Sequence, residues 1–153
     1  MKALNLPKYD FRLRKNADDK TEIFDAIRKR FYVLTPEEWV RQNFIQYLIS
    51  EKQFPASLMA IEKGLKLNGM QKRTDIVQYN TSGNPVVIVE CKAPEIKLSQ
   101  DTFDQAARYN MTLQVDYLII TNGLEHYACK MNYSENKIQF LEEIPTFKQL
   151  NNE

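Results

Sequence analysis

This sequence has few cysteines and histidines, and it lacks a long apolar run. Its 153 residues include two cysteines and one histidine. Cys91 and Cys129 form no Cys-x-x-Cys pair, which excludes a disulfide framework and a zinc-binding module. No apolar run approaches the roughly 20 residues that are needed to cross a bilayer, and the first residues lack the uninterrupted apolar core of a signal peptide. We therefore expect a cytoplasmic protein without a membrane span.

An excess of charge of one sign is also missing, since 21 lysines and arginines oppose 20 aspartates and glutamates. A net charge of +1 gives the whole chain no field that attracts nucleic acid or an anionic membrane, so any basic binding surface must be local. Only 4 glycines and 6 prolines accompany 8 Phe, 8 Tyr and 1 Trp, which excludes a disordered or low-complexity chain. Length and composition indicate one domain over residues 1–153.

The first part of the chain predicts an extension followed by a helix. Residues 9–34 alternate apolar and charged positions around a polar turn and suggest an extended hairpin, although residues 25–30 equally suit a helical turn. Thr35 is then suited to the N-cap of a helix, because Pro follows at the first helical position and Glu stands three residues after the cap. Val40, Phe44 and Leu48 continue it as an apolar stripe. We expect an N-terminal extension over about residues 1–34.

The rest of the chain predicts short strands and one further helix. Extended segments at 57–67, 73–79 and 85–93 are separated by turn formers and indicate an antiparallel three-strand meander. Ser99 suits the N-cap of a second helix, which a buried strand at 116–121, a returning strand at 126–131 and an edge strand at 137–144 follow. This order predicts an α/β (α+β) fold in which a central mixed sheet is flanked by helices.

The most informative signal lies on the two strands joined by the turn at residues 81–84. If Asn80 faces Pro85, Asp75 stands opposite Glu90, and Lys92 shares a face with Glu90. Opposed like charges on a half-buried face are destabilising, so a proton, a lysine or a metal must neutralise them. Mg²⁺ fits best, because it takes one or two carboxylates, keeps several waters and shares phosphate oxygens with a substrate. The pattern predicts a phosphodiester site, and a strand-end salt bridge is the structural alternative.

Asp75 followed by Glu90-x-Lys92, in this order of elements, resembles the PD-(D/E)XK nuclease superfamily. The segments TPEEWVRQ, RTDIVQY, VIVECKAP, FDQAARY and YLIITNG resemble the N-terminal nuclease domain of type I restriction enzyme R subunits. Gln105 and Tyr109 match the Gln-x-x-x-Tyr element that follows the catalytic lysine in that family. The resemblance implies a restriction-endonuclease-like core over about residues 35–130.

The resemblance also implies a role for each matched residue. Asp75 and Glu90 would ligate Mg²⁺, or Mn²⁺ in its place, and the Cys91 backbone carbonyl would complete the shell. Lys92 would orient or activate the attacking water. Gln105 and Tyr109 would support nucleic-acid contact or cleavage; because residues four apart share a helix face, a packing or hydrogen-bonding pair explains them equally without the family match.

A helical acid often joins this site in the superfamily, and two glutamates compete for that place. Glu38 is equally explained as the third residue of the capping box that begins at Thr35. Glu37 lies nearer the apolar stripe of its helix, although an acid in the first turn also suits the helix dipole. The sequence leaves both assignments open.

We therefore expect a Mg²⁺-dependent nuclease that acts on DNA. The alternative is a non-catalytic module that binds nucleic acid or protein and retains the nuclease fold. One site cuts one strand, so double-strand cleavage would require a homodimer or two successive visits. The resemblance further implies partner subunits of a restriction system.

Overall fold

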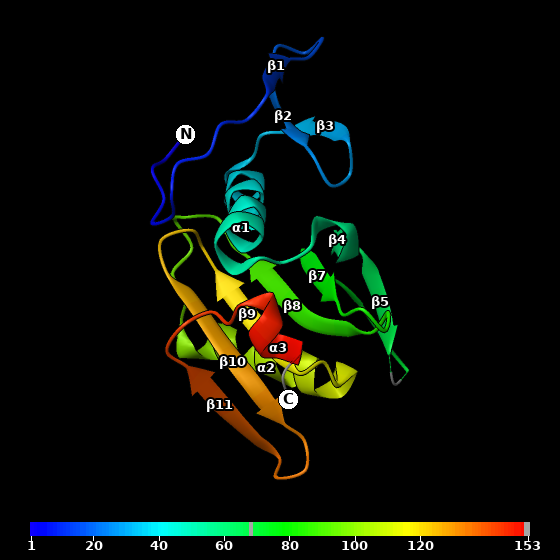
Figure 1. The fold of residues 1–153 in the computed structure, drawn as a ribbon. Helices are drawn as coiled ribbons and strands as arrows, with labels where there is room; N and C mark the ends of the chain where they lie inside the picture. The colour runs from blue at the N-terminus through cyan, green and yellow to red at the C-terminus, as the bar shows by residue number, and fades with distance from the viewer. Residues whose placement is uncertain (68, 152–153) are drawn as a thin grey trace.

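A six-stranded mixed sheet forms the centre of the computed structural model, which describes residues 1–67 and 69–151 (Figure 1). Its strand order is β11-β10-β9-β8-β7-β4. β8 and β9 are parallel, and all other neighbours in this sheet are antiparallel. A parallel pair needs a long crossover, which helix α2 (Gln100–Leu113) supplies. The strands are β4 (Met59–Ile61), β7 (Ile76–Tyr79), β8 (Pro85–Cys91), β9 (Tyr117–Thr121), β10 (His126–Asn132) and β11 (Lys137–Leu141).

Helices cover both faces of this sheet. Val87 and Val89 of β8 pack in one apolar cluster with α1 (Pro36–Lys52) and α3 (Phe147–Asn151). Ile88, which points the other way, packs with α2, and Figure 1 shows α3 in front of the sheet and α2 behind it. A strand covered on both faces is an uninterrupted apolar run. The expected fold class is therefore confirmed.

Both predicted helix starts are confirmed by their caps. The Thr35 hydroxyl accepts a hydrogen bond from the backbone N–H of Glu38, and the Ser99 hydroxyl accepts one from Thr102. Each helix ends at a glutamine in the left-handed region, with φ of 56° at Gln53 and 58° at Gln114. The polar groups at both helix starts are thus satisfied locally.

The meander is present as β4, β7 and β8, but the segment expected as its first strand is divided. β5 (Gly64–Leu67) and β6 (Met70–Arg73) pair only with each other, as a separate two-stranded sheet. The chain leaves β4 at Glu62, whose φ of 51° breaks the strand. Residue 68, one of the expected turn formers, lies outside the described residues.

The expected register holds along the strands and fails at their turn. Ile76 pairs with Val89, and Val77 pairs with Ile88, as predicted. Tyr79 pairs with Pro85 rather than with Val86, because a bulge follows Gln78. The prediction that Asn80 faces Pro85 is therefore wrong. The Asn80 side chain instead closes the turn by accepting the N–H groups of residues 82 and 84.

The N-terminal extension forms more than the expected hairpin. β1 (Leu13–Lys15), β2 (Thr21–Asp25) and β3 (Arg30–Val33) make a three-stranded antiparallel sheet, which lies beyond α1 at the top of Figure 1. β3 runs directly into α1. Across the described residues, no helix combines the length and hydropathy of a membrane span.

Candidate active site

The candidate site lies where β7 begins, β8 ends and α1 starts. Asp75 directly precedes β7, and its Oδ2 accepts the backbone N–H of Cys91 at 2.8 Å. This carboxylate occupies the place of the next acceptor in the β7–β8 ladder. It is thereby fixed beside the residue that separates Glu90 from Lys92, and its side chain is 20% exposed.

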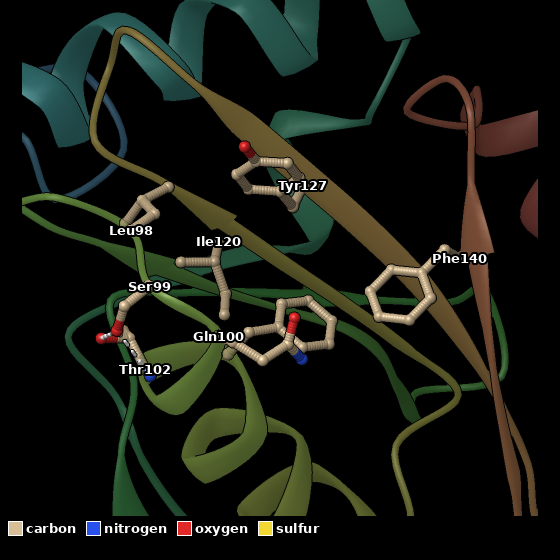
Figure 2. Close-up of a pocket in the computed structure, with 8 residues that line it drawn as sticks. Leu98, Ser99, Gln100, Thr102, Ile120, Tyr127 and Phe140 are labelled. Atoms are coloured by element: carbon tan, nitrogen blue, oxygen red, sulfur yellow. Dashed lines mark hydrogen bonds between the residues drawn. The ribbon is translucent and has the colours of Figure 1, made fainter.

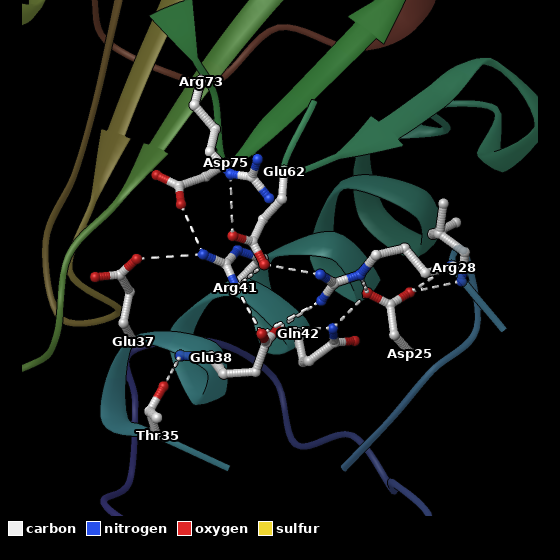
Figure 3. A network of polar contacts seen from close by, with 11 residues as sticks. Asp25, Arg28, Thr35, Glu37, Glu38, Arg41, Gln42, Glu62, Arg73 and Asp75 are labelled. Atoms are coloured by element: carbon white, nitrogen blue, oxygen red, sulfur yellow. Dashed lines mark hydrogen bonds and ion pairs between the residues drawn. The ribbon is translucent and has the colours of Figure 1, made fainter. Parts of the chain in front are cut away.

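Arg41 of α1 binds the other oxygen of Asp75. Its Nη2 donates to Asp75 Oδ1 at 2.8 Å, and its Nη1 donates to Glu38 Oε1 at 2.6 Å. Nη2 also reaches Glu37 at 3.2 Å. Figure 3 shows this guanidinium at the centre of converging carboxylates. Because the Arg41 side chain is only 6% exposed, these ion pairs are screened less by water than surface pairs are.

A second arginine joins the N-terminal sheet to the same cluster. Arg28 lies between the carboxylates of Asp25 at 2.7 Å, Glu62 at 2.8 Å and Glu38 at 3.2 Å (Figure 3). Gln42 of α1 donates to both Asp25 and Glu38. The turn after β2 is therefore fixed to the first half of α1 by charged and polar contacts.

The charges of the cluster shift the pKa values of its members. Burial, and next the negative charge of Asp75, raise the pKa of Glu37, while Arg41 and Lys92 oppose that rise. Burial disfavours the charged form of Arg41, but its hydrogen bond to Asp75 and the neighbouring carboxylates outweigh burial and raise its pKa. Asp75 and Lys92 therefore both lie within electrostatic reach of Glu37.

The thiol of Cys91 is not suited to ligation or nucleophilic attack. It is fully buried, and burial, followed by the charge of Asp75, raises its pKa well above the usual range. The residue contributes its backbone N–H to Asp75. Since a thiolate is needed for attack or soft-metal binding, the relevant groups of Cys91 are those of the main chain.

Glu90 and Lys92 end β8 on either side of Cys91. Glu90 stands beside Ile120 in the parallel pair with β9, and the backbone N–H of Lys92 donates to Thr121 O at 2.8 Å. Both side chains are half-buried. The structure thus places Asp75, Glu90 and Lys92 at one end of the β7–β8 pair.

The two helical glutamates occupy different environments. Both line a hollow of about 480 Å³ together with Arg41, Glu62 and Glu95, but the Glu37 side chain is 49% exposed. Glu38 is buried, and its carboxylate turns to Arg28, Arg41 and Gln42. The N–H of Thr35 donates to Val33 O, so the reciprocal half of a capping box is not formed.

Gln105 and Tyr109 lie on the outer side of α2. The buried side chains of this helix are Phe103, Ala106, Ala107, Asn110 and Leu113. Gln105 is exposed, and Tyr109 is 41% exposed. The two residues share a helical face as expected, but this face points to solvent rather than into the sheet.

A separate, mainly apolar hollow of about 230 Å³ lies between the first turn of α2 and the outer strands (Figure 2). Phe103 of α2, Ile120 of β9, Tyr127 of β10 and Phe140 of β11 are among its lining residues. It contains none of the predicted site residues.

Arg41 is the main site residue that sequence reasoning missed. The available signal was its spacing: Arg41 follows Glu37 by four residues and Glu38 by three, which places all three on one side of the helix. Asp25 and Arg28 show the same spacing. The partner across the fold, Asp75, is 34 positions away, and such a pair has no local signal.

The mixed sheet between helical layers defines an α/β fold, and an acid–lysine cluster lies at the ends of its adjacent strands. This is the fold of HsdR, the R subunit of type I restriction enzymes. The sequence model of a protein family, the type I restriction enzyme R protein N terminus, matches residues 36–145. The chain belongs to this family. A solved fragment assigned to an HsdR subunit of a type I restriction enzyme from Vibrio vulnificus is similar in fold, with a TM-score of 0.55 and 22% identity. The match covers 76% of this chain and 24% of that chain. No curated protein sequence matches.

Proposed function

We propose that this chain is a Mg²⁺-dependent nuclease domain that hydrolyses phosphodiester bonds in DNA, as part of a restriction system. One observation carries the proposal: the carboxylate of Asp75 is held on the Cys91 N–H, beside Glu90 and Lys92 at the end of β8. Membership in the R protein N-terminal family supports the restriction context. DNA as substrate, and partner subunits of such a system, are part of the same proposal.

The donors present at this strand end fit a magnesium ion. Mg²⁺ binds through one or two carboxylates and keeps most of its waters for exchange with phosphate oxygens. Asp75 and Glu90 supply two carboxylates, and the backbone oxygen of Cys91 is the third expected ligand. Within the described residues, no group of three His, Cys, Asp or Glu side chains is placed to hold a metal ion, so the shell of a bound Mg²⁺ would have to be completed by water and substrate oxygens.

The protein residues of the site then have distinct tasks. Bound Mg²⁺ would polarise the scissile phosphate and lower the pKa of a ligated water. Lys92 would orient the attacking water and stabilise the negative charge that develops on the phosphate. Glu37, half-exposed beside the hollow, is the better placed of the two helical acids to contact solvent at this site. Gln105 and Tyr109 would contact nucleic acid from the outer face of α2.

Arg41 adds a constraint on metal binding. It occupies Asp75 Oδ1, while the Cys91 N–H occupies Oδ2. A metal held by Asp75 would compete with these two donors for the carboxylate oxygens. If the metal displaced Arg41, Glu37 and Glu38 would remain as partners of the guanidinium.

The test is DNA cleavage by the full chain with Mg²⁺ or Mn²⁺, on linear, nicked and branched substrates. Asp75→Asn and Lys92→Met preserve side-chain size, and we expect each to lower cleavage by about 100-fold or more, the usual cost of losing one electrostatic stabiliser. Lys97→Met, at an exposed position nearby, serves as the control and should cleave normally. Thermal unfolding and Mn²⁺ titration calorimetry check folding and metal binding. Unchanged cleavage in both site variants would remove the proposed site.

A non-catalytic binding module that retains the nuclease fold is the second proposal. The observation in its favour is that both oxygens of Asp75 already have protein partners. It predicts that the wild-type chain binds DNA or a protein partner but cleaves no substrate with either metal, and that calorimetry detects no Mn²⁺ binding.

A further inference from the structure

The N-terminal sheet has an outer face that the proposed active site does not use. Phe24 of β2 pairs with Phe31 of β3, and the N–H of Phe24 donates to Arg12 O, so these three residues form one row across the sheet. Arg14 pairs with Glu22 in the next row on the same side. We call Arg12, Arg14, Phe24 and Phe31 the arginine face.

The guanidinium groups of this face lie on its aromatic rings. The Arg14 guanidinium carbon is 3.9 Å from the centre of the Phe31 ring, and that of Arg12 is 4.8 Å from the centre of the Phe24 ring. The two rings meet edge to face at 5.2 Å. Stacking orders a guanidinium while its N–H donors stay available at the edge of its plane. Both arginines are exposed. Arg14 Nε donates to Glu22 Oε1, and the remaining guanidinium N–H groups make no hydrogen bond within the described residues.

The arginine face carries positive charge that its neighbours do not cancel. Arg14 is paired with Glu22 at 2.7 Å. For Arg12, no carboxylate in the described part of the chain forms an ion pair. Residues 1–34 contain nine lysines and arginines and five aspartates and glutamates, a net charge of +4, whereas the whole chain has +1. Residues 35–153 therefore carry −3, and the near-neutral total hides a basic N-terminal segment.

The same face leads to the candidate active site. Val33 pairs with Glu22 and so continues the row of Arg14 across the sheet. Val33 also lines the hollow that contains Glu37 and Arg41. A polyanion that lies along the arginine face would therefore reach the edge of this hollow.

We propose that the arginine face binds the phosphate backbone of duplex DNA and directs it toward the hollow that Glu37 and Arg41 line. Phosphate groups are recognised by arginine N–H donors, whereas base stacking requires uncovered ring faces. Here guanidinium groups cover the rings, which favours phosphate contact over stacking. The choice of DNA rests on the proposed function, but binding along this face does not require cleavage.

The test measures binding without cleavage. Fluorescence anisotropy of a labelled 20-base-pair duplex is recorded in EDTA over a series of salt concentrations, for wild type and for the double variant Arg12→Gln/Arg14→Gln. At 50 mM salt we expect the association constant to decrease about 10-fold or more. The negative slope of its logarithm against log salt concentration should become shallower by about two, because two phosphate contacts are lost. The charge-matched control is Lys137→Gln/Lys148→Gln, at exposed positions of β11 and α3, and should bind as wild type does.

Two further measurements complete the test. Arg12→Lys/Arg14→Lys keeps both charges and should retain the salt slope; circular dichroism confirms that each variant is folded. The proposal is overturned if the glutamine variant binds with the wild-type affinity and slope, or if wild type binds single strands but not the duplex. A chain that binds through this face but cleaves nothing would contradict the nuclease function and leave this proposal standing.

Discussion

The first half of α1 buries charged and polar side chains around one apolar residue, Val40, and the half from Phe44 onward buries apolar ones. Glu38, Arg41 and Gln42 are as inaccessible to water as Phe44, Ile45 and Leu48 are. The apolar half gains free energy directly from leaving water. The polar half gains little, because the cost of desolvating each charge offsets its ion pairs. A buried network of charges that adds little stability is expected where the charges serve a function. This network includes Asp75, a residue of the candidate active site, through its ion pair with Arg41.

The largest effect on stability is expected in the apolar half of α1. Phe44 is fully buried, and Phe44→Ala should lower the free energy of unfolding by about 4 kcal/mol, since transfer and cavity costs add. Urea denaturation measures the change. Phe140→Ala makes the same change at a side chain that is 59% exposed and should cost far less. A loss at Phe44 no larger than at Phe140 would contradict the difference between the two halves.

In the polar half, Arg41→Met should cost about 3 kcal/mol, because it leaves buried carboxylates without their cation. The loss should shrink as the pH falls from 7 to 5. The pKa of Glu37 is already raised by burial and by Asp75, and Arg41 opposes that rise, so without Arg41 the folded chain takes up a proton at Glu37 more readily. Lys52→Met, in the last turn of the same helix, is the matched control.

A double variant separates pairing from packing at this position. Arg41→Met/Glu38→Gln removes one of the uncompensated carboxylates and should recover about 1 kcal/mol of the loss. Equal stability of the single and double variants would mean that Arg41 acts through packing alone.

The same contrast explains what the sequence could and could not predict. The apolar runs of β8 and β9, the caps at Thr35 and Ser99 and the pairing of Val77 with Ile88 follow from periodicity and turn chemistry. These are local or nearly local effects. Placing Asp75 near Glu90 and Lys92 required only that one register.

The parts that could not be predicted depend on distant partners or on single backbone angles. The division of the first meander segment follows from the positive φ at Glu62. Glutamate rarely adopts such a φ, so the sequence does not predict the break there. The contact of Arg41 with Asp75 joins a helix to a strand 34 residues later. The outer position of Gln105 and Tyr109 depends on which side of α2 packs on the sheet. The assignment of catalytic roles to these residues stays a prediction.

The smallest expected effect concerns His126, which packs against the apolar half of α1 by contacts with Phe44 and Tyr47. Its Nε2–H donates to Asn5 O at 3.0 Å, so Nδ1 is the acceptor for the Thr121 hydroxyl at 2.6 Å. Burial lowers the pKa of His126 below its ordinary value of 6.5, although the hydrogen bond to Asn5 opposes this.

Because the unfolded chain binds the proton more tightly than the folded chain does, neutral His126 contributes stability that is fully present above about pH 6.5 and is lost as the pH falls below it. His126→Gln keeps a donor for Asn5 O and cannot titrate. Urea denaturation from pH 7.5 to 5.5 should therefore show a smaller decline in the variant than in wild type. The carboxylates titrate in both chains, and His126 is the only histidine, so the difference between the two declines isolates this one group. Equal declines in the stability of the two chains would mean that the imidazole is protonated as easily in the folded chain as in the unfolded one. Packing against Phe44 and Tyr47 would then not shield His126 from water.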